Sequence, residues 1–425
     1  MARSFLVLSL LAAPSHALLG RDLKHKLKSY NLPAREDPDL LPPVFATDFL
    51  PDDFVAGQNA TKVVLDGWDG PAQYSGLFTF EAERDGAAPI ANTYFWYLPS
   101  LDKNPDAPVL LWLQGGPGGS SLYGMFTEIG PFTIDVDGKV VARDPNSNWN
   151  LHYDLVFLDN PCGVGFSFSN DESCYVTNEV QVGADIHAAL LQFYQLFPAK
   201  RTGKFYITGE SYAGKYIPAA AYTIFTRNKD AKPDDLIPLK GISIGDGAMD
   251  PPKQFQNFGP LLWYLGMVSA DERKVFDGYE AQIARHLAAD DPVGAFHAFD
   301  LMLNGDFVFP TYYYNVTGLT NYFNFEQGDC GACEPDYFSD WLDTPATRNL
   351  IHVGGIAYNS FNDTVEVSPR VSVLKRQKVF INPNSMVGKV IGVHVGRARF
   401  HAAPFGLIPW CLCCSVARAC VHRST

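Results

Sequence analysis

Apolar and polar positions along the chain predict strands that alternate with helices. Apolar residues between positions 179 and 197 recur three and four apart, which predicts a helix, and a second helix is expected after residue 212, ending before Asn228. Four short, nearly continuous apolar runs predict buried strands: residues 108–113, 153–159, 205–208 and 240–247. Strands of this kind, separated by helices, form a mostly parallel sheet covered on both faces. We therefore expect an α/β fold in which residues 108–113 form a central strand.

The remaining segments extend this plan. Residues 74–80 and 92–97 are aromatic and β-rich, and the charged loop between them predicts an antiparallel pair. We divide the chain into a signal peptide, a loosely structured leader or propeptide-like segment, a core, a helical and aromatic insertion, a return to the core and a divergent tail. These six parts are residues 1–17, 18–65, 66–249, 250–345, 346–366 and 367–425. An insertion at this point often forms a lid over the site.

Composition and the N-terminus narrow the class of protein. A hydrophobic content of 47%, with 19% charged residues, is typical of a globular chain, and the net charge of −13 argues against nucleic-acid binding. The N-terminus is typical of a cleaved signal peptide, with Arg3, an apolar run at 5–13 and small residues at 15 and 17. The same pattern is also compatible with a frayed terminal helix. No later apolar run is long enough to span a bilayer. The sequence thus predicts entry into the secretory pathway, with glycosylation sequons at Asn59, Asn315 and Asn362.

The stretch from residue 204 to 216 contains the first candidate for chemistry. A short strand leads through Gly209 to Ser211 and then to a helical segment. A serine on a sharp strand-to-helix turn presents its hydroxyl to a base, and its neighbours must be small to avoid a clash across the turn. Gly209 and Ala213 meet that requirement, so Ser211 is a candidate nucleophile. By itself the pentapeptide is equally compatible with a chance glycine–serine turn.

The glycine-rich loop 114–121 follows the predicted central strand. Glycines there allow backbone N–H groups to point into a site, where they could hold a phosphate or an oxyanion. The loop lacks the lysine of a Walker motif, and Pro117 fits a dinucleotide-binding turn poorly. We therefore prefer an oxyanion hole beside a nucleophile to a plain tight turn.

Two glutamates, Glu210 and Glu128, are placed to enter the same pocket. One directly precedes Ser211, and the other follows the glycine loop. Two carboxyl groups in contact cannot both ionise cheaply, so one keeps a proton and can donate a hydrogen bond to another carboxylate, such as a peptide C-terminus. That arrangement favours an acidic compartment. For either glutamate alone, a solvated surface position is the simpler interpretation.

Four motifs, found together and in this order, resemble the serine carboxypeptidase family, most closely its vitellogenic-like branch. They are residues 112–121, 159–168, 209–219 and 241–247. The resemblance runs from about residue 74 to 366 and implies an α/β-hydrolase fold with a helical insertion and no metal or cofactor. It further implies that Ser211 is the nucleophile and that the N–H groups of Gly116 and Tyr212 form the oxyanion hole. The substrate carboxylate would be held by Gln114, Gly115, Glu128 and Glu210; many members have Asn at the position of Gln114.

The C-terminal part departs from the family pattern. The family places its Asp and its His in the C-terminal part, in an Asn-Gly loop and a Gly-Gly-His loop, and neither loop occurs in that part of this sequence. No Asp follows Asp363, and the later histidines, His394, His401 and His422, lie in no comparable context. From about residue 367 we expect no resemblance to the family. This tail is basic, and its four cysteines, at 411, 413, 414 and 420, match no trusted zinc pattern. For Cys330 and Cys333 a structural disulfide is favoured over a redox pair.

The sequence therefore predicts a secreted or lysosomal serine-type carboxypeptidase. It would release C-terminal residues from peptides through an acyl-enzyme on Ser211 at acidic pH. The alternative is a catalytically dead binding protein that keeps the carboxylate pocket, because the family's Asp and His are absent; an acyltransferase on the same scaffold is a third reading. Expected partners are peptide or protein C-termini, without nucleic acid or a membrane anchor, and a homodimer is compatible with the sequence.

Overall fold

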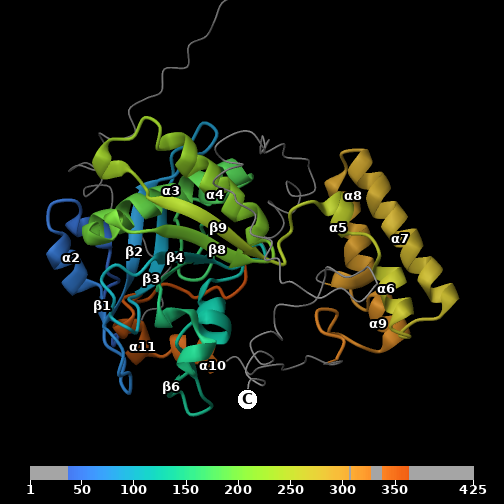
Figure 1. The fold of residues 1–425 in the computed structure, drawn as a ribbon, viewed down its shortest axis with the longest axis horizontal. Helices are drawn as coiled ribbons and strands as arrows, with labels where there is room; N and C mark the ends of the chain where they lie inside the picture. The colour runs from blue at the N-terminus through green and yellow to red at the C-terminus, as the bar shows by residue number, and fades with distance from the viewer. Residues whose placement is uncertain (1–36, 306–307, 327–336, 363–425) are drawn as a thin grey trace, which may run out of the picture.

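A seven-stranded mixed sheet forms the centre of the molecule (Figure 1). The computed structural model describes residues 37–305, 308–326 and 337–362. The sheet order is β1 (Lys62–Val63), β2 (Gln73–Glu81), β3 (Ile90–Leu98), β7 (Asp154–Leu158), β4 (Val109–Leu113), β8 (Phe205–Glu210) and β9 (Leu239–Gly245). Strands from β1 to β7 pair antiparallel, and those from β7 to β9 pair parallel. The predicted strands and the β2–β3 pair are thus confirmed, and a small hairpin, β5 (Phe132–Ile134) and β6 (Val140–Ala142), lies outside the sheet.

Strand β4 lies between β7 and β8 and is buried on both faces, as its apolar run predicts. Leu111 and its odd-numbered neighbours pack under α3 (Glu179–Leu196) and α4 (Ala213–Arg227). Leu110 and Trp112 face a second core under the π-helix η2 (Gly124–Ile129), α10 (Tyr337–Leu342) and α11 (Pro345–Leu350). Helices therefore cover both faces of the sheet, which confirms the α/β class.

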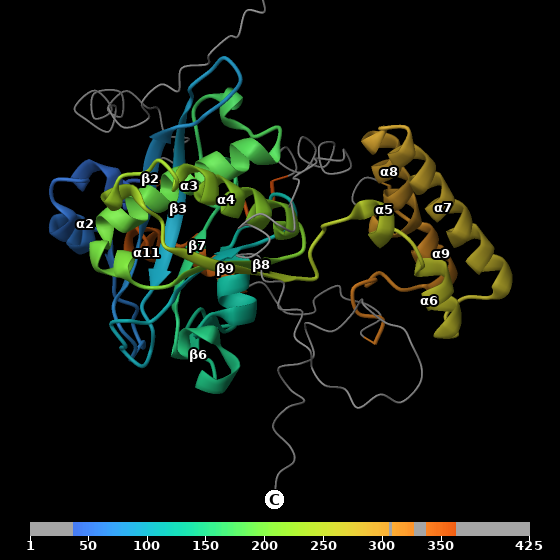
Figure 2. The ribbon, with the colours of Figure 1, turned by 45° about the horizontal axis from the view of Figure 1, so that its top comes forward.

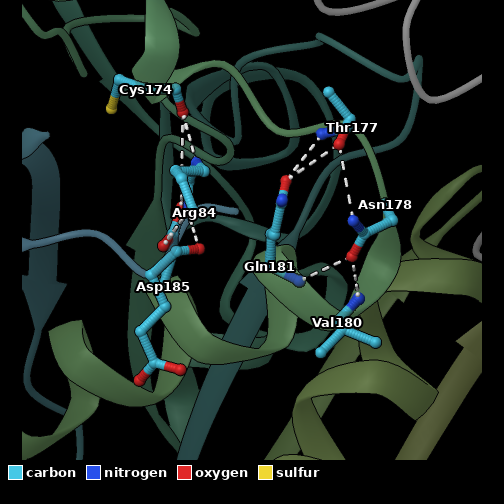
Figure 3. A network of polar contacts seen from close by, with 8 residues as sticks. Arg84, Cys174, Thr177, Asn178, Val180, Gln181 and Asp185 are labelled. Carbon is cyan, nitrogen blue, oxygen red and sulfur yellow. Dashed lines mark hydrogen bonds and ion pairs between the residues drawn. The ribbon is translucent and has the colours of Figure 1, made fainter. Parts of the chain in front are cut away.

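The start of α3 is fixed by side chains that bond to exposed backbone N–H groups (Figure 3). Asn178 accepts hydrogen bonds from the N–H groups of Val180 and Gln181, at 3.1 Å each. The Gln181 side chain in turn accepts from the N–H of Thr177 at 2.8 Å. The first N–H groups of a helix have no partner within it, so this cap determines where α3 begins.

The prediction of a loose segment over 18–65 is wrong for residues 37–65. This part contains η1 (Ala46–Phe49), α2 (Phe54–Ala60) and β1, and Val44 bonds to β2 and to His352 through its backbone. Ala46 and Leu50 are buried in the main core. Elements this short contain too few turns or alternations to produce a readable period.

Residues 250–305 and 308–326 form a helical unit beside the sheet in both views (Figures 1 and 2). The unit has its own core, built around Phe276 and Met302, and Ser269 and Glu272 form a capping box at the start of its longest helix. Its helices are α5 (Pro251–Gln254), α6 (Phe258–Tyr264), α7 (Ala270–Ala288), α8 (Pro292–Phe299), the π-helix η8 (Asp300–Asn304) and α9 (Tyr312–Thr317). The chain packs against the sheet again from α10 onward, earlier than the predicted return at residue 346.

Several sequence predictions lie outside the described residues. These are the signal peptide, residues 18–36 of the leader, Cys330 and Cys333, Asp363 and the tail from 367 to 425. In the part that the structure describes, none of the helices combines the length and the hydropathy needed to cross a membrane.

Candidate active site

Ser211 lies on the tight turn between β8 and α4 with a positive φ of 56°. Its N–H donates to the carbonyl of Gly245 at 3.0 Å, and its own carbonyl accepts from Gly214 at 3.0 Å and from Ala248 at 2.9 Å. Residues other than glycine rarely adopt this left-handed backbone conformation, and they keep it only where surrounding hydrogen bonds enforce it. The end of β9 thus holds the partly buried serine in a strained turn of the kind that nucleophiles occupy.

The turn requires small residues on both sides of Ser211, as predicted. A Cβ atom on Gly209 would overlap the carbonyl oxygen of Leu113 in the neighbouring strand. A Cβ on Gly214 would lie 2.8 Å from the backbone nitrogen of Ala248. Ala213 is fully buried against the same turn. The spacing of the glycines and the alanine is therefore explained by close packing of the serine turn against the end of β4 and the segment after β9.

The glycine loop after β4 approaches the serine closely. A Cβ atom on Gly115 would lie 2.9 Å from Ser211 Oγ and 2.7 Å from the backbone nitrogen of Tyr212. Gly116 has a φ of 114°, and its N–H donates to no backbone carbonyl within the described ranges. The structure thus brings together the loop and the serine turn that the sequence assigned to one site.

The glycine loop is supported by a segment that the sequence did not single out. Backbone bonds join Gly118 and Ser120 to residues 360–362, with Ser120 N donating to Ser360 at 3.0 Å and Asn362 N to Gly118 at 3.0 Å. On the other side, buried Asp159 accepts from Ser120 Oγ at 2.6 Å and from Ser121 N at 3.2 Å. Burial raises the pKa of Asp159 to about 6, against these hydrogen bonds, which lower it.

Gln114, Glu128 and Glu210 form one polar cluster beside Ser211. Gln114 Nε2 donates to Glu210 Oε1 at 2.8 Å and lies 3.5 Å from Glu128 Oε1. Trp112 Nε1 donates to Gln114 Oε1 at 2.9 Å, which fixes the orientation of the amide. The three residues come from the end of β4, from η2 and from the end of β8. The predicted carboxylate-binding residues are thus neighbours in space.

The two glutamates share a site in which one of them keeps its proton. Burial, the charge of Glu210 and a hydrogen bond with it together raise the pKa of Glu128 to about 9. Burial also raises the pKa of Glu210, and the charge of nearby Asp246 adds to the effect. Two such carboxyl groups titrate as a pair. At neutral and acidic pH the cluster therefore contains a proton that can be donated.

A further buried carboxyl group, which the sequence motifs did not indicate, bonds to Tyr212. The hydroxyl of Tyr212 donates to Glu179 Oε1 at 2.8 Å. Glu179 is fully buried at the start of α3, and burial raises its pKa to about 7, although Tyr212 and the charge of Lys215 lower it. This bond fixes the residue that follows Ser211. No pattern in the sequence links positions 179 and 212, because the two meet only through the packing of α3 on α4.

Ser211 Oγ makes no side-chain hydrogen bond to a residue that the structure describes. Three of the described histidines bond elsewhere: His152 to Asp102, His286 to Asp291 and His352 to the carbonyl of Ser75. The later histidines at 394, 401 and 422 are outside the described residues. Within the same described ranges, no group of three His, Cys, Asp or Glu side chains could hold a metal ion.

The three sequons differ in their surroundings. Asn59 in α2 and Asn315 in α9 are exposed. Asn362 is half-buried, and its side-chain nitrogen donates to the carbonyl of Gly163 at 2.7 Å. A glycan on Asn362 would have to replace this bond, whereas the other two asparagines face solvent.

Comparisons with known proteins place this chain in a family. The family model described as serine carboxypeptidase matches residues 68–391. The chain therefore belongs to the serine carboxypeptidase family. The match continues past residue 367, where the motifs led us to expect no further resemblance.

Curated relatives agree with this assignment. The chain is 39% identical to the venom serine carboxypeptidase of Apis mellifera, over 73% of this chain and 64% of that protein. It is 39% identical to the probable serine carboxypeptidase CPVL of Homo sapiens, over 63% and 56%, and 35% identical to the vitellogenic carboxypeptidase of Aedes aegypti, over 78% and 68%. The chain thus spans less than two thirds of the length of the first two relatives.

A solved structure supports the fold. The crystal structure of Kex1(Δ)p, a prohormone-processing carboxypeptidase from Saccharomyces cerevisiae, aligns with a TM-score of 0.56 at 24% identity. The alignment covers 73% of this chain and 72% of that chain. The α/β-hydrolase architecture is therefore shared with a carboxypeptidase of known structure.

Proposed function

We propose that this protein is a serine-type carboxypeptidase that releases C-terminal residues from peptides through an acyl-enzyme on Ser211 at acidic pH. One observation supports this proposal more strongly than any other. Ser211 in its left-handed turn lies against Gly115, and the adjacent residue Gln114 bonds to the glutamate pair. A nucleophile thus stands one residue away from a pocket that holds a proton for a carboxylate.

Binding of the peptide C-terminus is assigned to the polar cluster. The protonated member of the Glu128–Glu210 pair donates a hydrogen bond to the terminal carboxylate, and Gln114 and Gly115 complete the pocket. A proton donor in a buried site strengthens this contact, because few water molecules compete for it. As pH rises and the pair loses its proton, the second negative charge repels the substrate.

The chemical step is assigned to the serine turn and the glycine loop. Ser211 Oγ attacks the scissile carbonyl carbon and transfers its proton to a base, which passes it to the leaving amine. The oxyanion accepts hydrogen bonds from the N–H groups of Gly116 and Tyr212, and water then hydrolyses the ester on Ser211. Because no described residue bonds to Ser211 Oγ, the proposal requires a base from outside the described ranges.

We also propose that the protein enters the secretory pathway, acts on peptide C-termini in secreted or lysosomal form, and carries glycans at Asn59, Asn315 and Asn362. The predicted signal peptide and the exposed positions of Asn59 and Asn315 support this. The carboxyl pair keeps its proton in an acidic destination, as its binding role requires.

The proposal is tested with a pair of peptides that differ only at the C-terminus. Purified full-length chain at pH 5 is incubated with a peptide bearing a free carboxylate and with its C-terminal amide, and released amino acids are measured by mass spectrometry. We expect release from the free-acid peptide only, and none with Ser211→Ala.

The same peptides separate catalysis from binding. Ser211→Ala should still bind the free-acid peptide in a fluorescence anisotropy titration, because the pocket does not include the hydroxyl. If the unmodified chain binds the peptide and releases no amino acid, the proposed enzymatic activity is refuted. The protein would then be a carboxylate-binding protein. A folded chain that neither binds nor cleaves would refute the assigned pocket as well.

A further inference from the structure

Two cysteines, Cys162 and Cys174, meet in the core beside the active-site loops. Cys162 lies in the loop after β7, and Cys174 ends the 3-10 helix η5 (Glu172–Cys174). Their exposed fractions are 5% and 0%, and both belong to the core under α3 and α4. In this structure they are separate thiols within hydrogen-bond contact of each other.

Independent contacts place the same two segments together. A Cβ atom on Gly163 would lie 2.6 Å from Cε1 of Tyr175, so the residues after each cysteine are also tightly packed. The guanidinium of Arg84 donates to the carbonyl of Cys174 at 3.0 and 2.6 Å and pairs with Asp185 at 2.6 Å (Figure 3). The backbone at Cys174 is therefore held in place beside the segment that contains Cys162.

We propose that Cys162 and Cys174 form a disulfide in the mature protein. The inference rests on the proposed passage through the secretory pathway, where disulfides form and persist. Each thiol gives up one hydrogen, and the disulfide of an oxidant, either a dithiol–disulfide oxidoreductase or oxidised glutathione, is reduced to two thiols. One S–S bond breaks and one forms. Because both sulfurs are buried, the exchange takes place during folding.

The proposed disulfide stabilises the loop after β7, which supports the glycine loop on the oxyanion side of the site. The carbonyl of Gly163 accepts from Asn362 Nδ2 at 2.7 Å, and Gly165 pairs with Asn359 through its backbone. The segment that contains these asparagines pairs in turn with Gly118 and Ser120 of the glycine loop. A disulfide at Cys162 thus anchors the outer support of that loop to η5.

The alternative is a pair of packed thiols that only fill space. Contact with Cys174 and burial raise the pKa of the Cys162 thiol, so in the folded protein it would be a poor nucleophile. Packed thiols of this kind would persist as thiols in the secreted protein and would be modified only after unfolding. The oxidation state of the pair therefore distinguishes the two interpretations.

Mass spectrometry of the secreted, full-length chain tests the proposal. Trypsin cuts after Arg143 and Lys200, and the resulting peptide contains no cysteine besides Cys162 and Cys174. When the chain is denatured with an alkylating agent and no reductant, we expect a peptide two hydrogens lighter than the dithiol that carries no alkyl group. After reduction it should carry two. A peptide alkylated twice without reduction, or either cysteine linked elsewhere in the chain, would overturn the proposal.

Melting temperatures of Cys162→Ala, Cys174→Ala and the double variant give a second test. A disulfide predicts that each single change lowers the melting temperature by as much as the double change, a shift of about a few degrees. It also predicts that reductant lowers the melting temperature of the unmodified chain by more than it lowers that of the double variant. Losses that add, with the same effect of reductant on both chains, would indicate packed thiols. The mass measurement uses the natural chain and stands even if a variant does not fold.

Discussion

Replacing Glu128 by Gln should remove much of the pH dependence of stability between pH 5 and pH 7. The change keeps the size of the side chain, and its amide replaces the shared proton with a permanent donor toward Glu210. Gln114 Nε2, 3.5 Å from Glu128 Oε1, can still face an acceptor oxygen at position 128. The variant therefore separates the effect of the proton on stability from the effect of side-chain packing.

The magnitude follows from the pKa of Glu128, raised from 4.5 to about 9 by burial and by Glu210. Between these values the folded chain holds a proton that the unfolded chain has lost, so stability falls as pH rises. One proton corresponds to about 1.4 kcal/mol per pH unit, so the loss from pH 5 to pH 7 is at most about 2.7 kcal/mol. Burial of Glu210 leaves some pH dependence in the variant, so the difference between the chains is the quantity to measure.

Urea unfolding followed by tryptophan fluorescence at both pH values provides the measurement. The exposed change Glu326→Gln in the helical unit serves as the matched control, because it removes a carboxyl group from the surface. We expect the natural chain and the control to lose more stability than Glu128→Gln on going to pH 7. Equal losses in all three chains would show that the buried pair holds no proton, and the reasoning would fail.

Three further changes test other parts of the account. Gly115→Ala places a methyl group 2.9 Å from Ser211 Oγ and 2.7 Å from the nitrogen of Tyr212, so we expect lost labelling by a serine-directed probe and a lower melting temperature. Tyr212→Phe removes the donor to buried Glu179 and should cost about 1–3 kcal/mol in urea unfolding at pH 8, much of which Glu179→Gln restores. Leu111→Ala in fully buried β4 should cost about 2–5 kcal/mol in the same assay, and a smaller loss would mean that the core can collapse around the site.

The sequence predicted the parallel part of the sheet well, because buried strands are read from apolar runs alone. The run at 108–113 became β4 with both faces covered, and the spacing at 179–197 became α3. The structure adds that Asn178 caps this helix, which the sequence analysis did not single out. These features depend on neighbours along the chain.

What the sequence could not supply depends on contacts between distant residues. Residues 37–65 gave no period, yet Ala46 and Leu50 are core residues, because short elements gain their order from packing. The pairing of 360–362 with the glycine loop and the bond from Tyr212 to Glu179 join segments far apart in sequence. Neither has a local signal.

In the candidate site, too, some features follow from local sequence signals and others do not. Ser211, Gly209 and the glycine loop were predictable, since a tight turn and close backbone approach demand particular small residues. The contact between Glu128 and Glu210 was expected from chemistry, and the amide of Gln114 joins them. The role of Ser211 as a nucleophile stays a prediction, because its base is not among the described residues.

Labelling of the purified, full-length chain by a fluorophosphonate probe at mildly acidic pH tests the central claim most directly. Such a probe reacts with an activated serine and ignores an ordinary hydroxyl. The account predicts labelling of the natural chain that disappears in Ser211→Ala, while both proteins show the same circular dichroism. A folded natural chain that takes up no probe would contradict the assignment of Ser211 as an acyl nucleophile.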